Sequence, residues 1–184
     1  EAENLGGIKR ELIARCYTTP LVADIHFNPT AADAAAYLLD KVRINPGNFV
    51  HSAPTFKQLS YTDEEYTAEL QKLKERFIPF LNICKEQHTA IRLGVNYGCL
   101  SDRIMSRDGD TPEGMVESCM EFLRICRSEN FDNVVISIKA SKTVVMVRTV
   151  RRLIETMESE GMNYPLQWGV TEDGDGEDGR IKSA

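Results

Sequence analysis

Hydrophobic and polar positions follow the same pattern in five short segments of the chain. Each segment is a run of aliphatic residues that ends on polar or charged side chains, and the segments cover residues 22–26, 42–45, 91–96, 135–139 and 169–172. Between them, apolar residues recur at the three- and four-residue spacing of amphipathic helices. Thr30, Thr62, Thr111 and Ser141 are expected to cap these helices, residues 97–110 to form a polar loop, and a last helix to begin near Lys182. Short strands that alternate with helices predict an α/β fold with a parallel sheet, because parallel neighbours need a crossover connection.

Polar residues within the predicted strands lie two or four positions apart, which places them on one face of the sheet. Strands of an all-parallel sheet are normally buried on both faces and apolar throughout. Because burying an unpaired polar group is costly, their repetition at strand ends indicates a ligand site. The pairs are Asp24 with His26, Arg43 with Asn45, Arg92 with Asn96, and Ser137 with Lys139.

Two architectures fit this alternation, an open doubly wound sheet and a (β/α)8 barrel. An open sheet collects its binding residues at one switch point, whereas a barrel takes them from the ends of many strands. Polar ends on all the predicted strands favour the barrel. A complete barrel has eight strands and about 250 residues, but this chain has 184. The sequence therefore predicts a partial TIM-type barrel, with residues 1–184 forming part of the substrate-binding domain of a longer enzyme.

Composition narrows the possible partners and location. The formal net charge of −6 argues against nucleic acid or an anionic membrane as the main partner. No apolar run approaches the roughly 20 residues that a membrane-spanning helix needs. The five cysteines are scattered without a C-x-x-C pair, which predicts reduced thiols in the cytoplasm. Cys119 and Cys126 fit a buried helix stripe better than a metal site, so no metal ligand is predicted in this chain.

Three basic residues on three predicted strands are the strongest indication of a ligand. Arg43, Arg92 and Lys139 are expected to converge on the same face. Arginine presents a planar fork that fits phosphate oxygens, and lysine adds a point charge. A cationic cluster in an acidic protein indicates an anionic small ligand, most simply a phosphate or diphosphate. The alternative is a structural network in which each base pairs with Asp24, Glu172 or another carboxylate.

Acid–base and hydroxyl-binding candidates lie beside these bases. Asp24 and His26 share a strand face and suit proton transfer or the binding of substrate hydroxyls, although a histidine here can equally be structural. Glu172, at the end of the last predicted strand, is a candidate general acid or base, or a partner for a lysine. Asn45 and Asn96 can both donate and accept, which suits a polyol.

The C-terminal segment adds a second possible anion site. Glycines precede Arg180, Lys182 and Ser183, and a glycine-rich turn before a helix N-terminus offers free N–H groups to an anion. The acidic residues of this segment do not complete a calcium loop, because Asp178 stands where the required glycine belongs. Lys139 also remains a candidate Schiff-base lysine of an aldolase-like barrel.

The motifs that carry these residues resemble the 4-hydroxy-3-methylbut-2-enyl diphosphate synthase family. The resemblance runs through the chain in order, and two further segments, residues 100–105 and 109–114, are similar to the longer form of the family. The matching motifs are Pro20 to Phe27, Arg43 to Asn48, Gly94 to Asn96, Ser137 to Ser141, Gly169 to Glu172 and Gly179 to Ala184.

The resemblance implies a TIM-barrel oxidoreductase of the methylerythritol phosphate route to isoprenoids, which reductively opens a cyclic diphosphate. It implies that the bases on the strands, assisted by Lys182 and Ser183, hold the diphosphate. Asp24, His26 and the two asparagines would line the polar end of the substrate, and Glu172 would support proton delivery at the reacting carbon.

The resemblance also implies parts that this chain lacks. The family uses a [4Fe–4S] cluster whose ligands belong to a separate domain, and its electron donor is ferredoxin or flavodoxin. We therefore expect the 184-residue chain alone to be inactive. Asp173 stands where the family pattern expects a small residue and adds a negative charge. The implied location is the bacterial cytoplasm, or the plastid for a plant protein.

Two other interpretations stay open from the residues alone. The chain could belong to another phosphate-binding TIM barrel, such as an aldolase or a pterin-binding synthase. It could also be a non-catalytic assembly segment, because an unclosed barrel exposes two sheet edges that can pair with a second copy.

Overall fold

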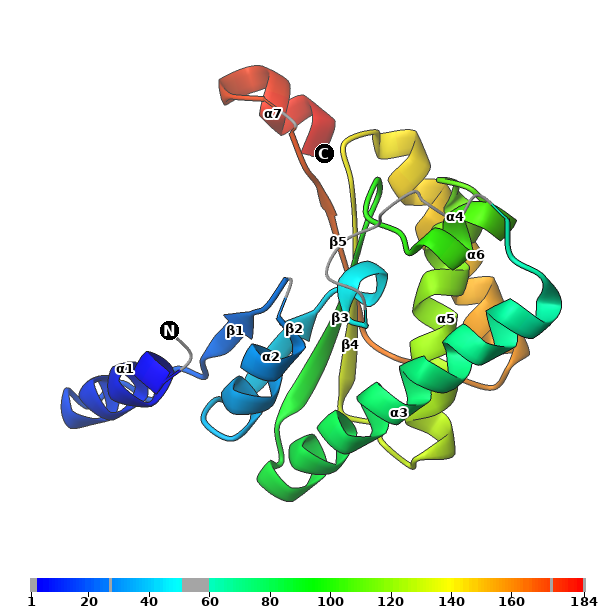
Figure 1. Ribbon diagram of the computed structural model, residues 1–184. Coiled ribbons are helices and arrows are strands. Elements are labelled where there is room, and N and C mark those ends of the chain that lie inside the picture. Colours follow the sequence, from blue (N-terminus) through cyan, green and yellow to red (C-terminus); the bar gives the residue numbers. More distant parts are fainter. Residues whose placement is uncertain (1–2, 27, 51–59, 173, 184) are drawn as a thin grey trace.

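Parallel strands form the centre of the molecule (Figure 1). The computed structural model describes residues 3–26, 28–50, 60–172 and 174–183. Over these residues the chain forms a five-stranded sheet in the order β1-β2-β3-β4-β5, and every neighbouring pair is parallel. The predicted α/β class is confirmed. The strands are β1 Val22–Asp24, β2 Lys41–Ile44, β3 Ala90–Asn96, β4 Val134–Ala140 and β5 Leu166–Val170.

Helices connect the strands and cover one face of the sheet. In Figure 1, α3, α5 and α6 lie along one side of the strands, α1 projects beyond β1, and α7 extends from the end of β5. None of the helices in the described ranges is long and apolar enough to cross a membrane. The helices are α1 Glu3–Ala14, α2 Pro29–Ala36, the short 3-10 helix η1 Pro46–Asn48, α3 Asp63–Gln87, α4 Asp102–Arg107, α5 Pro112–Ser128, α6 Thr143–Ser159 and α7 Gly176–Ser183.

The sheet is curved, as a partial barrel requires. Arg92 of the central strand places Nη2 3.7 Å from Asp24 Oδ2 on β1 and donates from Nη1 to Gln167 Oε1 on β5 at 3.4 Å. In a flat sheet the first and fifth strands would lie roughly 19 Å apart, at about 4.8 Å per strand. One guanidinium can contact both edge strands only because the face that carries Arg92 is concave. We call this concave face the inner face.

The opposite face of the sheet holds the hydrophobic core. The aliphatic residues predicted for this face on β2, β3 and β4 are all 1% exposed or less. They pack beneath an aromatic cluster in which Phe77 of α3 and Phe122 of α5 have ring centroids 4.8 Å apart in an edge-to-face arrangement. The predicted division into an apolar and a polar face is therefore confirmed. The core strand residues are Val42, Ile44, Ile91, Leu93, Val95, Ile136 and Ile138.

Three thiols belong to this core. Cys84, Cys119 and Cys126 are buried, and burial raises the pKa of all three, to about 12 for Cys84 and Cys119. Cysteine is reactive as the thiolate, so these side chains behave as small apolar groups at neutral pH. The expected role of Cys119 and Cys126 in core packing is confirmed.

Local sequence signals place two helix starts correctly. Thr62 and Glu65 form a complete capping box at the start of α3, with Thr62 N donating to Glu65 Oε2 at 2.8 Å. Thr111 caps α5 by accepting from Gly114 N at 3.1 Å, and Pro112 occupies the first turn. Each cap satisfies a backbone N–H that would otherwise lack a partner.

Other helix boundaries differ from the sequence prediction. The side chain of Asn28, not of Thr30, caps α2, because Asn28 Oδ1 accepts from Ala31 N at 3.2 Å and Pro29 fills the first position. Ser141 does not cap α6. Because β4 continues to Ala140, the next two residues form the turn, and α6 begins after Lys142 without a side-chain cap.

Two helices occupy segments that were expected to be loops. Residues 97–110 were predicted as a polar loop, but they contain α4. The C-terminal helix was expected to begin only near the last residues, whereas α7 already starts at Gly176. Both segments are short and polar, so the periodicity of apolar residues does not show them.

Candidate functional site

Arg43 is the most completely enclosed charged side chain on the inner face, with 1% exposure. Its Nη1 donates to Asp24 Oδ1 at 3.0 Å, and its Nη2 donates to the carbonyl of Gly94 at 3.0 Å and to Asn96 Oδ1 at 3.3 Å. Burial lowers the pKa of Arg43, and the Asp24 carboxylate opposes that shift. The side chain is thus fixed by groups from β1 and β3. The ion pair with Asp24 is one of the two interpretations that the sequence left open.

The hydrogen bond from Arg43 to Gly94 replaces a bond missing from the sheet. Ala90 N donates to Asp40 O, and β2 and β3 continue in register up to Ile44 and Leu93. Continuing this parallel ladder would require the residue at position 46 to donate to Gly94, but Pro46 has no N–H. The Arg43 guanidinium satisfies the carbonyl instead.

Gly94 also provides the space in which Arg43 lies. A Cβ at position 94 would stand 2.2 Å from Arg43 Nε and 3.0 Å from Cζ, which no side chain can do without moving the guanidinium. Glycine is therefore required here by close approach of a side chain rather than by backbone conformation.

The other predicted bases lie on the same concave face. Arg92 is the register partner of Arg43, and its loosely held guanidinium lies over the centre of the face. Lys139 is half-buried on β4, in register with Asn96. Lys139 and Arg43 both act electrostatically on His26. The structure thus brings the three bases toward one region, with Lys139 nearest the carboxyl ends of the strands, where barrels place their functional groups.

His26 lies just beyond β1, beside these charges. Its pKa is lowered by burial first and then by the positive charge of Arg43, while Asp24 acts in the opposite direction and Lys139 lowers it further. A histidine in this position is neutral at pH 7, so it can both donate and accept a hydrogen bond.

Asn45 has a partly structural role. Its Oδ1 accepts from Gly47 N at 3.0 Å and caps η1, while its Nδ2 is buried without a hydrogen-bond partner among the described residues. Asn96 orients Arg43 through its own Oδ1. Both amides keep a donor available on the inner face.

Glu172 and the C-terminal bases do not join this cluster through any described contact. Glu172 is exposed and adopts a left-handed backbone with φ of 57°. Arg180 and Lys182 are exposed within α7. They lie toward its C-terminal end, while Glu177 and Asp178 occupy its first turn, so the two bases do not sit at the N-terminus of this helix. Their role in binding the substrate stays a prediction. Ser183 ends α7, and its side chain lies outside the described set, as does Asp173.

Some inner-face residues escaped the list of candidates drawn from the sequence. Gln167 accepts a hydrogen bond from Arg92, and Gly94 leaves the space that the Arg43 side chain occupies. The hydroxyl of Ser137 is buried without a partner among the described residues. The strand pattern placed Ser137 on this face with Lys139 but gave it no role in binding. Gly94 and Gln167 carry no local sequence signal of their contacts.

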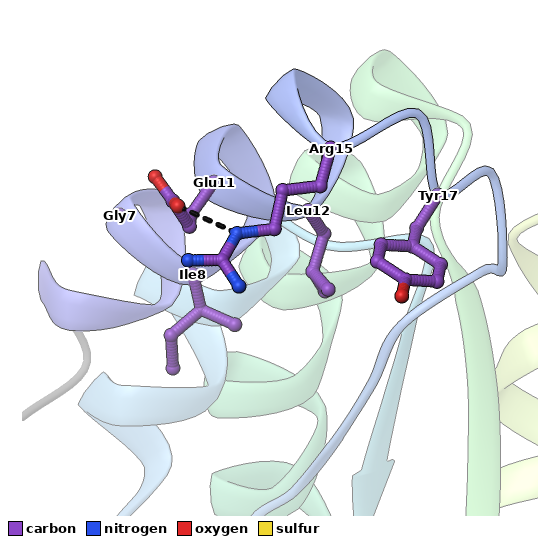
Figure 2. A pocket seen from close by; sticks show the side chains of 6 residues that line it. All are labelled: Gly7, Ile8, Glu11, Leu12, Arg15 and Tyr17. Carbon is purple, nitrogen blue, oxygen red and sulfur yellow. Dashed lines mark hydrogen bonds and ion pairs between the residues drawn. The ribbon is translucent and has the colours of Figure 1, made fainter.

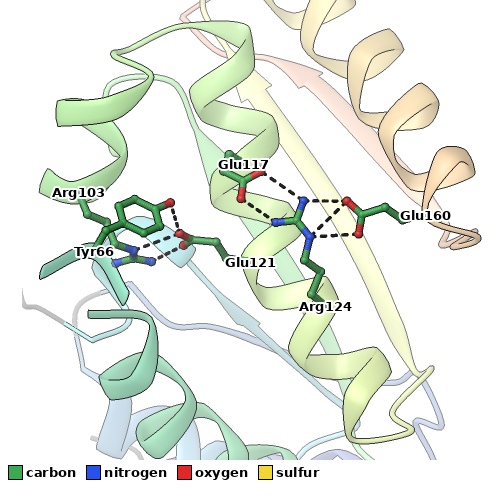
Figure 3. Close-up of polar contacts among 6 residues, drawn as sticks. All are labelled: Tyr66, Arg103, Glu117, Glu121, Arg124 and Glu160. Atoms are coloured by element: carbon green, nitrogen blue, oxygen red, sulfur yellow. Dashed lines mark hydrogen bonds and ion pairs between the residues drawn. The ribbon is translucent and has the colours of Figure 1, made fainter. Parts of the chain in front are cut away.

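A buried ion pair fixes the loop beside the site (Figure 3). Arg103 of α4 donates from Nε and Nη2 to the Glu121 carboxylate on α5, and Tyr66 of α3 donates to Glu121 Oε1 at 2.5 Å. Between β3 and α4, the carbonyl oxygen of Cys99 packs against Gly47 of η1. A Cβ at position 47 would lie only 1.7 Å from that oxygen. The cluster therefore anchors α4, and the loop that precedes α4 packs directly on η1.

A hollow on the molecular surface lies along α1, away from the inner face. A cavity of about 430 Å³ lies along α1, lined by Ile8, Leu12 and Tyr17 and by an Arg15–Glu11 ion pair of 2.8 Å (Figure 2). Ile8 and Tyr17 are both more than half exposed. This cavity contains none of the predicted site residues.

Over the described ranges, no cluster of three or more His, Cys, Asp or Glu side chains could hold a metal ion. Fold and site together define an α/β domain of the partial-barrel class, with a concave face that carries basic side chains from three strands. The whole sequence, residues 1–184, matches the GcpE TIM-barrel domain family, and the chain belongs to that family. The resemblance inferred from the motifs is confirmed.

Relatives of known name agree with this assignment. The chain is 73% identical to the 4-hydroxy-3-methylbut-2-en-1-yl diphosphate synthase (flavodoxin) of Parabacteroides distasonis and covers 30% of that protein. It is 71% identical to the enzyme of the same name from Bacteroides fragilis and covers 29% of it. The chloroplastic synthase (ferredoxin) of Oryza sativa is 51% identical, with 25% covered. All 184 residues align in each case, so the chain spans less than a third of these relatives.

The buried ion pair gives a prediction on stability. Replacing Glu121 with alanine leaves Arg103 buried without a counter-charge, which we expect to lower the free energy of unfolding by about 3 kcal/mol or more. Glu117→Ala is the matched control on the same helix. It removes an exposed contact to Arg124, which keeps Glu160, and should cost about 1 kcal/mol or less. Urea unfolding of both variants measures the difference, and equal losses would contradict the proposed anchoring.

The lowered pKa of His26 gives a prediction on pH. Its pKa in the folded protein lies below the 6.5 expected for the unfolded chain, so the unfolded state binds the proton more tightly. The contribution of His26 to stability is therefore complete above pH 6.5 and decreases as the pH falls through the folded pKa. We expect an NMR titration to give a midpoint below 6.5, and inorganic pyrophosphate to raise it by adding negative charge. A midpoint at or above 6.5 without pyrophosphate would refute this account.

Proposed function

We propose that this chain is part of the substrate-binding barrel of a 4-hydroxy-3-methylbut-2-en-1-yl diphosphate synthase and binds the diphosphate of its cyclic substrate on the inner face. The observation that supports this most is the gathering of Arg43, Arg92 and Lys139 around Asp24 and His26. The names of the relatives support the particular reaction.

Charge balance favours a diphosphate on this face. Among the described side chains, these three bases lie against the carboxylate of Asp24, beside a neutral His26, which leaves an excess of positive charge. The protein as a whole carries a net charge of −6, so this excess is local. Basic groups that converge on a concave surface reinforce one another's attraction for an anion.

The remaining residues would position the rest of the substrate. Asn45 Nδ2 is available as a donor to hydroxyl oxygens, and neutral His26 can exchange a proton with them. Glu172 is proposed to support proton delivery at the reacting carbon. In the structure it lies at the strand end without a described contact to the bases, so this role requires the substrate to extend toward β5.

Redox chemistry would depend on parts outside this chain. We propose that a [4Fe–4S] cluster supplies electrons in the whole protein and that flavodoxin or ferredoxin supplies them to the cluster, as the names of the relatives suggest for the donor. The described residues offer no ligand set for such a cluster. The higher identity to bacterial relatives favours a bacterial cytoplasmic enzyme over a plastid one.

Because the redox group is proposed to lie outside this chain, we predict that the isolated chain does not convert the substrate. The purified 184-residue chain, supplied with the cyclic diphosphate and a strong chemical reductant, should form no allylic diphosphate. Chromatographic analysis of the products measures this directly. Product formation above a protein-free control would contradict the proposal that the redox group lies elsewhere.

Anion binding is tested by replacing a base on the inner face. Arg92→Gln removes one of the charges proposed to hold the diphosphate, and we expect the affinity for inorganic pyrophosphate to fall at least tenfold, because hydrogen bonds between charged groups are strong. Arg151→Gln is the control, since Arg151 is exposed on α6. Isothermal titration calorimetry at low ionic strength measures both. An equal loss in the two variants would mean that only the net charge matters.

A further inference from the structure

Ser137 carries a buried hydroxyl whose hydrogen-bonding capacity is unused. The residue is 1% exposed, and its Oγ has no partner in the described part of the chain. It lies on the inner face two residues before Lys139, with Gly94 of β3 and Gln167 of β5 as its neighbours in register. A buried hydroxyl without a partner is unfavourable, and the cost is recovered when an acceptor arrives.

A second unused donor lies on the neighbouring strand. Arg43 Nε is buried without a partner, although both terminal nitrogens of the same guanidinium are bonded. It stands over Gly94, 2.2 Å from the position that a Cβ would take. Gly94 and Ser137 are register partners on adjacent strands, about 4.8 Å apart. This spacing separates the strand backbones, so the two donors lie over neighbouring positions of the inner face, where one acceptor oxygen can be shared between them.

Arg92 lies over this pair of donors. β4 lies between β3 and β5, so the contact from Arg92 to Gln167 crosses the inner face of β4 at the level of Ser137. The contact is long at 3.4 Å, the approach to Asp24 is longer still at 3.7 Å, and Arg92 Nε has no partner. The guanidinium of Arg92 is therefore held only weakly over the two donors, and an anion would be a stronger hydrogen-bond partner for it.

We propose that Ser137 determines the specificity of this site for a phosphoryl group. When an anion draws the guanidinium of Arg92 away from Gln167, Ser137 Oγ and Arg43 Nε donate to the same phosphoryl oxygen. The hydroxyl of Ser137 adds a directional hydrogen bond without adding charge. The bases alone do not provide an uncharged donor of this kind. This inference rests on the proposed function, because it concerns the same anion site.

The test compares Ser137→Ala with a matched control, Ser118→Ala, which removes a hydroxyl that is equally buried on α5. Both variants are made in the whole protein to which this sequence belongs. Calorimetry with inorganic pyrophosphate should show that Ser137→Ala raises the Kd about tenfold, the effect expected for one hydrogen bond to a charged group, whereas Ser118→Ala leaves it unchanged. Without pyrophosphate, the melting temperature of Ser137→Ala should equal or exceed that of the parent, because no bond is lost.

Other results overturn the inference in distinguishable ways. If the parent binds pyrophosphate and Ser137→Ala binds it equally well, Ser137 is not a ligand residue, although the proposed function stands. If Ser137→Ala fails to fold or melts lower without pyrophosphate, the hydroxyl has a structural partner and the inference fails. If the parent itself does not bind pyrophosphate, the proposed anion site fails together with the inference.

Discussion

The position of the Arg43 guanidinium is the constraint on which the rest of the inner face depends. A buried arginine that lacks a counter-charge costs the fold several kcal/mol. Here Asp24 supplies the charge, Asn96 supplies an oxygen, and the Gly94 carbonyl is available because Pro46 cannot bond to it. A side chain at position 94 would displace the guanidinium. The register of three strands is therefore tied to one polar side chain.

The same arrangement links the core to the ligand face. Aromatic and aliphatic packing on the helix side holds the strands, and the strands hold the bases at their register positions. Around the strand ends, the buried Arg103–Glu121 pair anchors α4, and the loop that precedes α4 packs on η1 next to Asn45. Rigid supports of this kind are what a binding site needs, because ligand groups must be met by donors that are already in place.

Strand parity is local, so the sequence predicts it well, whereas local capping signals identify some helix starts but not those of α2 and α6. Alternation placed Arg43 and Arg92 on the face opposite the core, and Thr62 and Thr111 mark real helix starts. Contacts between distant segments are not local. Nothing near Asp24 in the sequence shows that it pairs with both arginines, and a glycine gives no sign of the side chain that lies over it. The short polar helices α4 and α7 lack the apolar periodicity that would mark them.

The central claim is that one anion is held on the inner face by bases from separate strands. A crystal structure of a protein containing this sequence, grown with inorganic pyrophosphate, tests it most directly. The account predicts pyrophosphate within hydrogen-bond distance of Arg43, Arg92 and Lys139, with Arg92 released from Gln167. Pyrophosphate bound only outside the inner face, with the contacts of Arg92 to Gln167 and Asp24 intact, would contradict it.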